Sequence, residues 1–131
     1  MKTAVHTFLL FCVMAWCSEL FAKRPAPKEV PPVTHAGIQY QVVHSKWKNG
    51  QQNGGYLQAI DTKDGKKVWG ILVYVVEYDP ELESDVQDCF INSMRLSKEK
   101  NKLIVTNEVD DHYYVDLKTQ RVVHFLPPRR P

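Results

Sequence analysis

Four carboxylates occupy alternate positions of one acidic stretch: Asp79, Glu81, Glu83 and Asp85. Calcium is a hard cation that takes about six to eight oxygen ligands, so this spacing raises the question of a calcium site. The helix–loop–helix calcium motif would need Gly at position 84 and Glu at position 90, where the chain has Ser84 and Phe90. We therefore favour a solvated acidic loop over residues 79–85 and assign no metal ligand. A calcium-stabilised structural domain is kept as an alternative.

A second polar cluster offers acid–base chemistry: Glu108, Asp110, Asp111 and His112. A carboxylate beside a histidine can act as general acid and base, but no nucleophile accompanies this pair in the sequence. Because Asp110-Asp111 is also ordinary turn chemistry, we expect a hairpin tip here. A small envelope enzyme that uses Glu108 and His112 is the alternative.

Cys89 is the only cysteine that follows the first 22 residues. A thiol can act as a nucleophile with a distant histidine as its base, and four histidines are available for that role: His35, His44, His112 and His124. No local signature of a cysteine nucleophile surrounds Cys89, so we expect an inert, half-buried thiol. An enzyme that uses Cys89 stays an alternative. We assign no catalytic residue and no cofactor.

The polar loop 46–54 holds one large apolar side chain, Trp47, with no periodic reason to be buried. It stands among amide side chains that could join it in a contact patch: Asn49, Gln51, Gln52 and Asn53. These five residues are the candidate contact patch for a protein, peptide or glycan partner. Simple anchoring of the loop by Trp47 is the alternative.

The first 22 residues have the pattern of a secretory signal. The apolar run 8–16 is shorter than the roughly 20 residues of a membrane-spanning helix, and the small residue Ala22 precedes a charged pair. We expect residues 1–22 to be cleaved, with a lipid-modified Cys17 as the alternative. One remaining cysteine forms no internal disulfide, which favours a periplasmic or secreted bacterial protein over a stapled eukaryotic domain.

The formal net charge is +2, and opposite charges are interspersed along the chain. Nothing resembles the clustered Lys/Arg stripe of a nucleic-acid binder. We therefore expect no binding to nucleic acid or to anionic membranes. We also expect no integral membrane segment after signal cleavage.

Alternation of apolar and polar residues predicts an all-β fold, mainly an antiparallel meander of about seven strands with the option of one short helix. The expected strands are 38–44, 56–62, 67–78, one that ends at Leu96, 103–109, 112–117 and 121–125. Residues 67–78 are apolar on both faces, which indicates the central strand of the sheet. A short helical turn is expected at 84–87, with a longer helix over 86–96 as the alternative.

Proline content sets the predicted domain limits. Four prolines fall within residues 23–34 and fix an extended, largely unpaired leader. The expected organisation is a signal peptide, a proline-rich leader, an antiparallel β domain and a flexible tail: 1–22, 23–36, 37–126 and 127–131.

One hairpin pattern occurs twice in the chain. Residues 55–69 contain an apolar strand, a polar turn opened by Asp61 and a second apolar strand, and residues 112–123 repeat this order with Asp116 in the place of Asp61. The run Ala59-Ile60-Asp61, followed by Gly65-Lys66 and Trp69, resembles the repeat of pyrroloquinoline-quinone-type β-propellers. That resemblance implies blade-like hairpins without a closed ring and without a quinone site, since two blades are the most that the chain supplies.

The chain as a whole also resembles small secreted bacterial proteins of unassigned function. From these observations we predict a secreted or periplasmic, non-catalytic binding or interaction module. The enzyme and the calcium-stabilised domain described above are the rival hypotheses.

Overall fold

The computed structural model describes residues 24–45, 50 and 52–126. These residues form two antiparallel sheets of four strands, and in both sheets the strands follow one another in chain order. The first sheet contains β1 (Val33–His35), β2 (Ile38–Val43), β3 (Tyr56–Asp61) and β4 (Lys67–Leu72). The second sheet contains β5 (Ile91–Leu96), β6 (Lys102–Asn107), β7 (His112–Asp116) and β8 (Val122–Phe125). A short helix, α1 (Ser84–Gln87), lies in the connection between the sheets.

The all-β class, the meander order and the short helix are therefore confirmed. The structure has eight strands where about seven were predicted. The additional strand is β1, which comes from the proline-rich leader and pairs with β2 through Val33 and Tyr40. Val30 of the leader is only 8% exposed and belongs to the core. The leader is therefore more involved in the fold than its prolines alone suggested.

The predicted central strand 67–78 is wrong in length and in place. β4 ends at Leu72 and lies at the edge of the first sheet. After Leu72 the chain leaves the sheet, and Val73 and Tyr74 are buried in the core. The Tyr74 hydroxyl donates a hydrogen bond to the Cys89 carbonyl oxygen at 2.7 Å. The segment 67–78 is apolar on both faces because its first part forms an edge strand and the following residues, Val73 and Tyr74, pack in the core. It is not a central strand.

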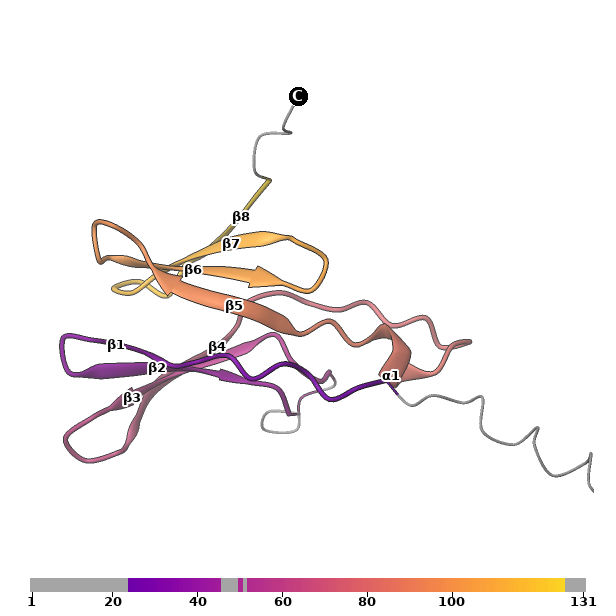
Figure 1. Ribbon diagram of the computed structural model, residues 1–131, viewed down its shortest axis with the longest axis horizontal. Helices are drawn as coiled ribbons and strands as arrows, with labels where there is room; N and C mark the ends of the chain where they lie inside the picture. The colour runs from indigo at the N-terminus through magenta and orange to yellow at the C-terminus, as the bar shows by residue number, and fades with distance from the viewer. Residues whose placement is uncertain (1–23, 46–49, 51, 127–131) are drawn as a thin grey trace, which may run out of the picture.

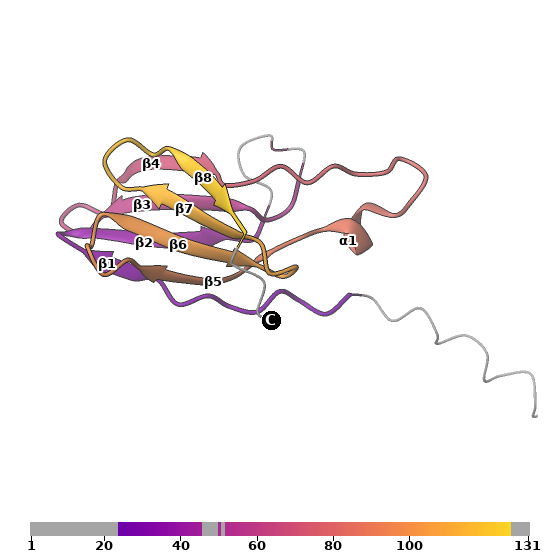
Figure 2. The same ribbon diagram turned by 90° about the horizontal axis from the view of Figure 1, so that it is seen from above.

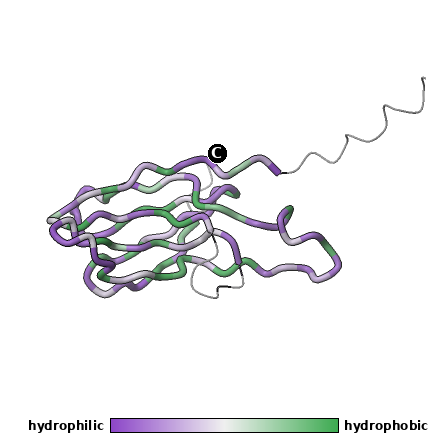
Figure 3. Tube along the Cα trace, turned by 90° about the horizontal axis from the view of Figure 1, so that it is seen from below, coloured by the Kyte–Doolittle hydropathy of each residue, from purple (hydrophilic) through white to green (hydrophobic). Residues whose placement is uncertain are grey.

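The two sheets lie face to face, with β1 near β5 and β4 near β8 (Figures 1 and 2). Hydrophobic and hydrophilic residues alternate along the strands (Figure 3), and in β6 and β7 every second residue is buried between the layers. The most deeply buried apolar side chains come from both sheets: Leu57, Ala59, Ile91, Leu103, Val105 and Val115. Their removal from water is the main source of stability in this fold, whose described residues contain no disulfide.

The two copies of the repeated hairpin adopt the same turn. In the first copy, Gly65 N donates to Asp61 O at 2.9 Å, and Lys63 N donates to the Asp61 carboxylate at 2.8 Å. In the second copy, Gln120 N donates to Asp116 O at 2.8 Å, and an amide likewise donates to the Asp116 carboxylate at 2.8 Å. The prediction that both hairpins share one pattern is confirmed. Gln120 takes the positive φ, 58°, that Gly65 takes at 70°.

The strands divide the molecule into two ends. The turn end carries the four short connections 36–37, 62–66, 97–101 and 117–121. The loop end carries the leader and the longer connections 44–55, 73–90 and 108–111. Figure 1 shows the turn end at the left and the loop end at the right. The described residues form two sheets, and no ring of blades closes among them.

Candidate functional site

The predicted contact patch at Trp47 is largely a structural feature where it is described. Trp47, Asn49 and Gln51 lie outside the described residues. Gln52 is only 6% exposed, and its side-chain amide donates to Tyr74 O at 3.1 Å and Gly54 O at 3.0 Å. Its side-chain oxygen accepts from the Val76 amide at 2.9 Å. Gln52 thus joins two connections of the loop end and is not free to contact a partner.

Asn53 belongs to a second polar network at the loop end. Its side-chain amide donates to the Asp88 carboxylate at 3.1 Å, and the Tyr78 hydroxyl donates to the other Asp88 oxygen at 2.6 Å. Burial, together with this bond, raises the pKa of Tyr78 to about 12. Asp88 is itself buried, and each of its carboxylate oxygens accepts a hydrogen bond from one of these neighbouring donors. This network fixes the protruding connection 73–90 against the rest of the loop end.

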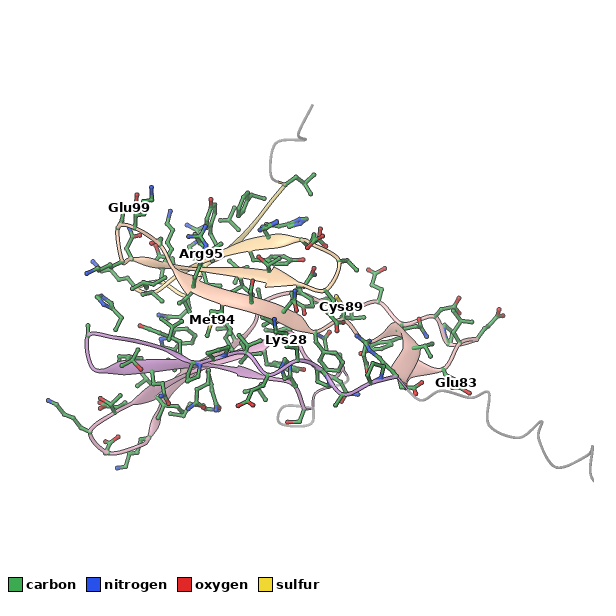
Figure 4. The ribbon with its side chains drawn as sticks, viewed as in Figure 1. Lys28, Glu83, Cys89, Met94, Arg95 and Glu99 are labelled. Atoms are coloured by element: carbon green, nitrogen blue, oxygen red, sulfur yellow. The ribbon has the colours of Figure 1, made fainter. Side chains whose placement is uncertain are left out.

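The acidic stretch 79–85 does not gather its carboxylates around one point. The Asp79 carboxylate accepts from the Glu81 amide at 2.9 Å, and the Asp85 carboxylate accepts from the Val86 amide at 3.0 Å. Both are local turn contacts. Within the residues that the structure describes, no three His, Cys, Asp or Glu side chains are placed to hold a metal ion. The stretch forms part of an exposed connection, as the position of Glu83 in Figure 4 shows.

Cys89 and the histidines that could serve as its base have separate surroundings. Burial raises the pKa of the Cys89 thiol, which therefore stays protonated at neutral pH. His44 Nε2 lies 2.9 Å from Lys28 O, and His124 Nε2 lies 3.4 Å from the Asp111 carboxylate. In the described part of the chain no hydrogen bond joins Cys89 to a histidine. This geometry fits an inert thiol.

Glu108 and His112 are also engaged with different partners. The Glu108 carboxylate accepts from the Phe90 amide at 3.1 Å and pairs with the guanidinium of Arg24. That guanidinium also donates to Asp88 O and stands 4.8 Å from the centre of the Phe90 ring. His112 Nδ1 lies 3.2 Å from the Thr106 hydroxyl. Glu108 thus anchors the leader to the loop end, and the structure gives it no histidine partner for proton transfer.

One surface, along one side of the two layers, was not predicted from the sequence because it arises only from the fold. We call this side, formed by β4 and β8, the open edge. Among the described residues, β4 pairs only with β3, and β8 pairs only with β7. Of the eight exposed large apolar residues in this part of the chain, five lie on these two strands or on their continuations: Val68 (54%), Leu72 (37%), Val75 (72%), Val123 (57%) and Leu126 (75%). Exposed apolar side chains beside unpaired strand backbone are the features of a surface that another chain covers.

The opposite side of the molecule is protected. There β1 has only three residues, follows two prolines and lies near β5. The leader runs along this side (Figure 2), with Val30 buried in the core and Arg24 fixed at the loop end. Short strands and prolines are devices that keep a sheet edge from pairing with other chains. The chain therefore covers one edge and leaves the other open.

The backbone of β4 has hydrogen-bonding groups that point away from the sheet. Val73 N donates to Gly55 O at 2.8 Å, and the register continues with Ile71 opposite Leu57 and Trp69 opposite Ala59. In an antiparallel pair the backbone groups of successive residues point alternately toward and away from the partner strand. Gly70 and Leu72 therefore direct their N–H and C=O groups to the open edge. The pairing is regular from Trp69 to Leu72, and its bulge lies beyond, toward Lys67.

Comparison of the chain with protein-family models, with curated proteins and with solved structures gave no match. Among the described residues, none of the helices has the length and apolar character needed to cross a membrane.

Proposed function

We propose that this chain is an exported, non-catalytic interaction module that binds an extended segment of a protein partner along β4. The observation that carries the proposal is the contrast between the two sides of the molecule. On the leader side the edge strands are the three-residue β1 and β5, whose exposed side chains are polar, and the leader runs beside them, whereas the open edge has unpaired backbone and five exposed apolar side chains among the described residues. Periplasmic or secreted localisation is part of the same proposal and follows from the signal pattern of residues 1–22.

An added strand would complete the backbone pairing of β4. The outward groups of Gly70 and Leu72 would supply hydrogen bonds to it, as in other cases where an extended peptide extends a sheet. A glycan offers no regular series of backbone donors and acceptors to match these groups, so a protein or peptide is the better partner. The proposal therefore narrows the predicted partner class.

The side chains of β4 determine which residues a bound partner segment should carry. Leu72 and Gly70 share one face of the strand, while Trp69 and Ile71 share the other and are packed against the core. Gly70 leaves an uncovered position beside Leu72, where a large apolar side chain of the partner can lie over the backbone. We therefore expect an extended partner segment with apolar residues at alternating positions and a bulky one opposite Gly70.

The test is capture of proteins from an envelope extract by the tagged mature chain, with a variant that carries Val68→Lys and Leu72→Lys. Both side chains are exposed, so the two changes leave the core intact while placing charges on the edge. The control is Val109→Lys, which replaces a valine of the loop 108–111 that is more exposed than either edge residue. The edge variant should lose the captured partner, and the control should keep it.

Hydrogen exchange then identifies the mode of binding. A partner strand on β4 should slow exchange of the Gly70 and Leu72 amides, which face solvent in the free protein. A partner that binds with these two amides still exchanging as in the free chain would refute strand addition. Equal capture by the edge variant and the wild type would refute the site.

A further inference from the structure

The fold separates charges that are interspersed along the chain. Nine Lys and Arg side chains stand at the turn end: Lys63, Lys66, Lys67, Arg95, Lys98, Lys100, Lys102, Lys118 and Arg121. Only four carboxylates accompany them there: Asp61, Asp64, Glu99 and Asp116. The loop end instead has ten carboxylates: Glu29, Glu77, Asp79, Glu81, Glu83, Asp85, Asp88, Glu108, Asp110 and Asp111. Arg24 and Lys28 are its only described Lys or Arg. Opposite charges are interspersed along the sequence, as expected. On the surface of the described residues, however, they are separated between the two ends.

The carboxylates of the turn end are largely occupied by backbone donors. Asp61 and Asp64 each accept a backbone N–H at 2.8 Å. Asp116 accepts the amides of Lys118 and Thr119 at 2.8 and 2.9 Å, and these bonds lower its pKa. In contrast, no ion pair within the described residues joins Lys98, Lys100 or Lys118 to a carboxylate. These three exposed lysines are available to an external anion.

We propose that the turn end docks on an anionic lipid surface, with the strands directed away from the membrane. The cations come from the tips of three connections and from the strand ends beside them, in both layers, so they form a broad array and not a single pocket (Figures 1 and 4). A membrane leaflet that carries many headgroup phosphates matches such an array, because each Lys or Arg near the surface contributes separately. One small anion would engage only a fraction of these charges.

The length of the strands makes this orientation possible. Strands of six residues separate the two ends by roughly 20 Å, and the Debye length at physiological salt is about 8 Å. The acidic loop end is therefore screened from a surface that the turn end touches. The opposite orientation would bring ten carboxylates to the same surface and would be repelled.

Nucleic acid is the less suitable polyanion. Single strands bind through bases that stack on free aromatic faces. Two half-buried aromatic residues of the second sheet stack on each other, with the Tyr114 and Phe125 rings 4.2 Å apart and nearly parallel at 5°. Lys102 Nζ lies 5.7 Å from the Tyr114 ring. These contacts use the ring faces that a base would need.

The experiment is co-sedimentation of the mature chain with phosphatidylcholine vesicles that do or do not contain phosphatidylglycerol. The test variant carries Lys98→Gln, Lys100→Gln and Lys118→Gln, three exposed changes. The matched control carries Leu82→Glu, Val86→Glu and Val109→Glu, which alters the net charge by the same amount at the loop end, also at exposed positions.

We expect binding to the phosphatidylglycerol vesicles alone, weakened as salt increases. The lysine variant should bind on the order of 100-fold more weakly, since three surface charges are lost, and the control should bind as the wild type does. Absence of vesicle binding at low salt would overturn the proposal. Unchanged binding by the lysine variant, or loss of binding by the control, would also overturn it. Binding to soluble heparin or single-stranded DNA but not to vesicles would show that a polyanion, and not a membrane, is the partner.

Discussion

Replacement of Gln52 by Ala tests whether this residue holds the loop end together or contacts a partner. The side chain makes three hydrogen bonds, to Gly54 O, Tyr74 O and Val76 N, and is buried. Each such bond contributes about 0.5–1.5 kcal/mol net, so the loss is about 3 kcal/mol for three bonds. For a domain of this size that loss lowers the melting temperature by roughly 12–24 °C.

The assay is thermal and urea unfolding of the mature chain followed by circular dichroism. The matched control is Gln39→Ala, which removes an amide on the solvent side of the first sheet with one hydrogen bond, from Gln41 Nε2. This change should cost less than about 1 kcal/mol. The structural role of Gln52 would be refuted if Gln52→Ala lost no more stability than the control variant and also captured less of the partner.

A conservative change at the same position gives a pH signature. In Gln52→Glu the new carboxylate still accepts from Val76 N but faces the Gly54 and Tyr74 carbonyl oxygens without a proton to donate. Burial beside these oxygens raises its pKa in the folded state above that in the unfolded state. The variant should then be more stable at acidic pH and lose stability as pH rises through the folded pKa. A flat difference from the wild type across pH would contradict this reasoning.

Three further outcomes follow from single contacts. Arg24→Ala should lower stability by about 1–2 kcal/mol, because it removes the Glu108 pair and the Phe90 ring contact. Lys28→Ala, at an exposed position, should not lower stability. Equal melting temperatures of these two variants would show that the leader is not anchored. Lys100→Gly should raise stability by about 0.5–1 kcal/mol because φ is 57° at Lys100, whereas Lys98→Gly should not; equal effects on the urea midpoint would remove backbone strain as the cause. The pKa of Tyr78 rises from 10.0 to about 12 on folding, so the stability from this group is complete below pH 10.0 and is lost as pH rises to about 12. In alkali, the stability of Tyr78→Phe, measured by urea unfolding, should therefore fall less steeply with pH than that of the wild type. Equal slopes would show that the hydroxyl is exposed in solution.

Part of the fold was predictable from the sequence because it depends on interactions between residues close together in the chain. The Asp61 and Asp116 hairpins were predicted because an aspartate at the first turn position accepts the amides of the residues that follow it. Those contacts are present in both turns. Because the interactions span only a few residues, they depend on nothing distant in the chain. The all-β class was predictable for the same reason.

Features that depend on distant parts of the chain were not predicted. β4 ends at Leu72 because Tyr74 is drawn into the core, where its ring stacks on Tyr113 at 5.2 Å. Gln52 is fixed in part by the Tyr74 carbonyl and the Val76 amide, which belong to a different predicted element, the strand 67–78. The two charged ends arise only when the strands align, since neighbours in sequence such as Arg95 and Asp88 then lie toward different ends. The open edge likewise depends on which strand is last in the sheet.

The two proposed surfaces can be occupied at the same time, because they lie in different directions on the molecule. The turn end faces along the strands, whereas the open edge runs beside them (Figures 1 and 2). A chain docked through Lys98, Lys100 and Lys118 would therefore keep β4 accessible to a partner segment from the side. Since the two sets of substituted residues are distinct, their effects should be independent. The lysine variant should still capture the protein partner, and the Val68→Lys, Leu72→Lys variant should still bind vesicles. Loss of both activities in either variant, with the fold intact by circular dichroism, would mean that one surface serves both and that the separation argued from the topology is wrong.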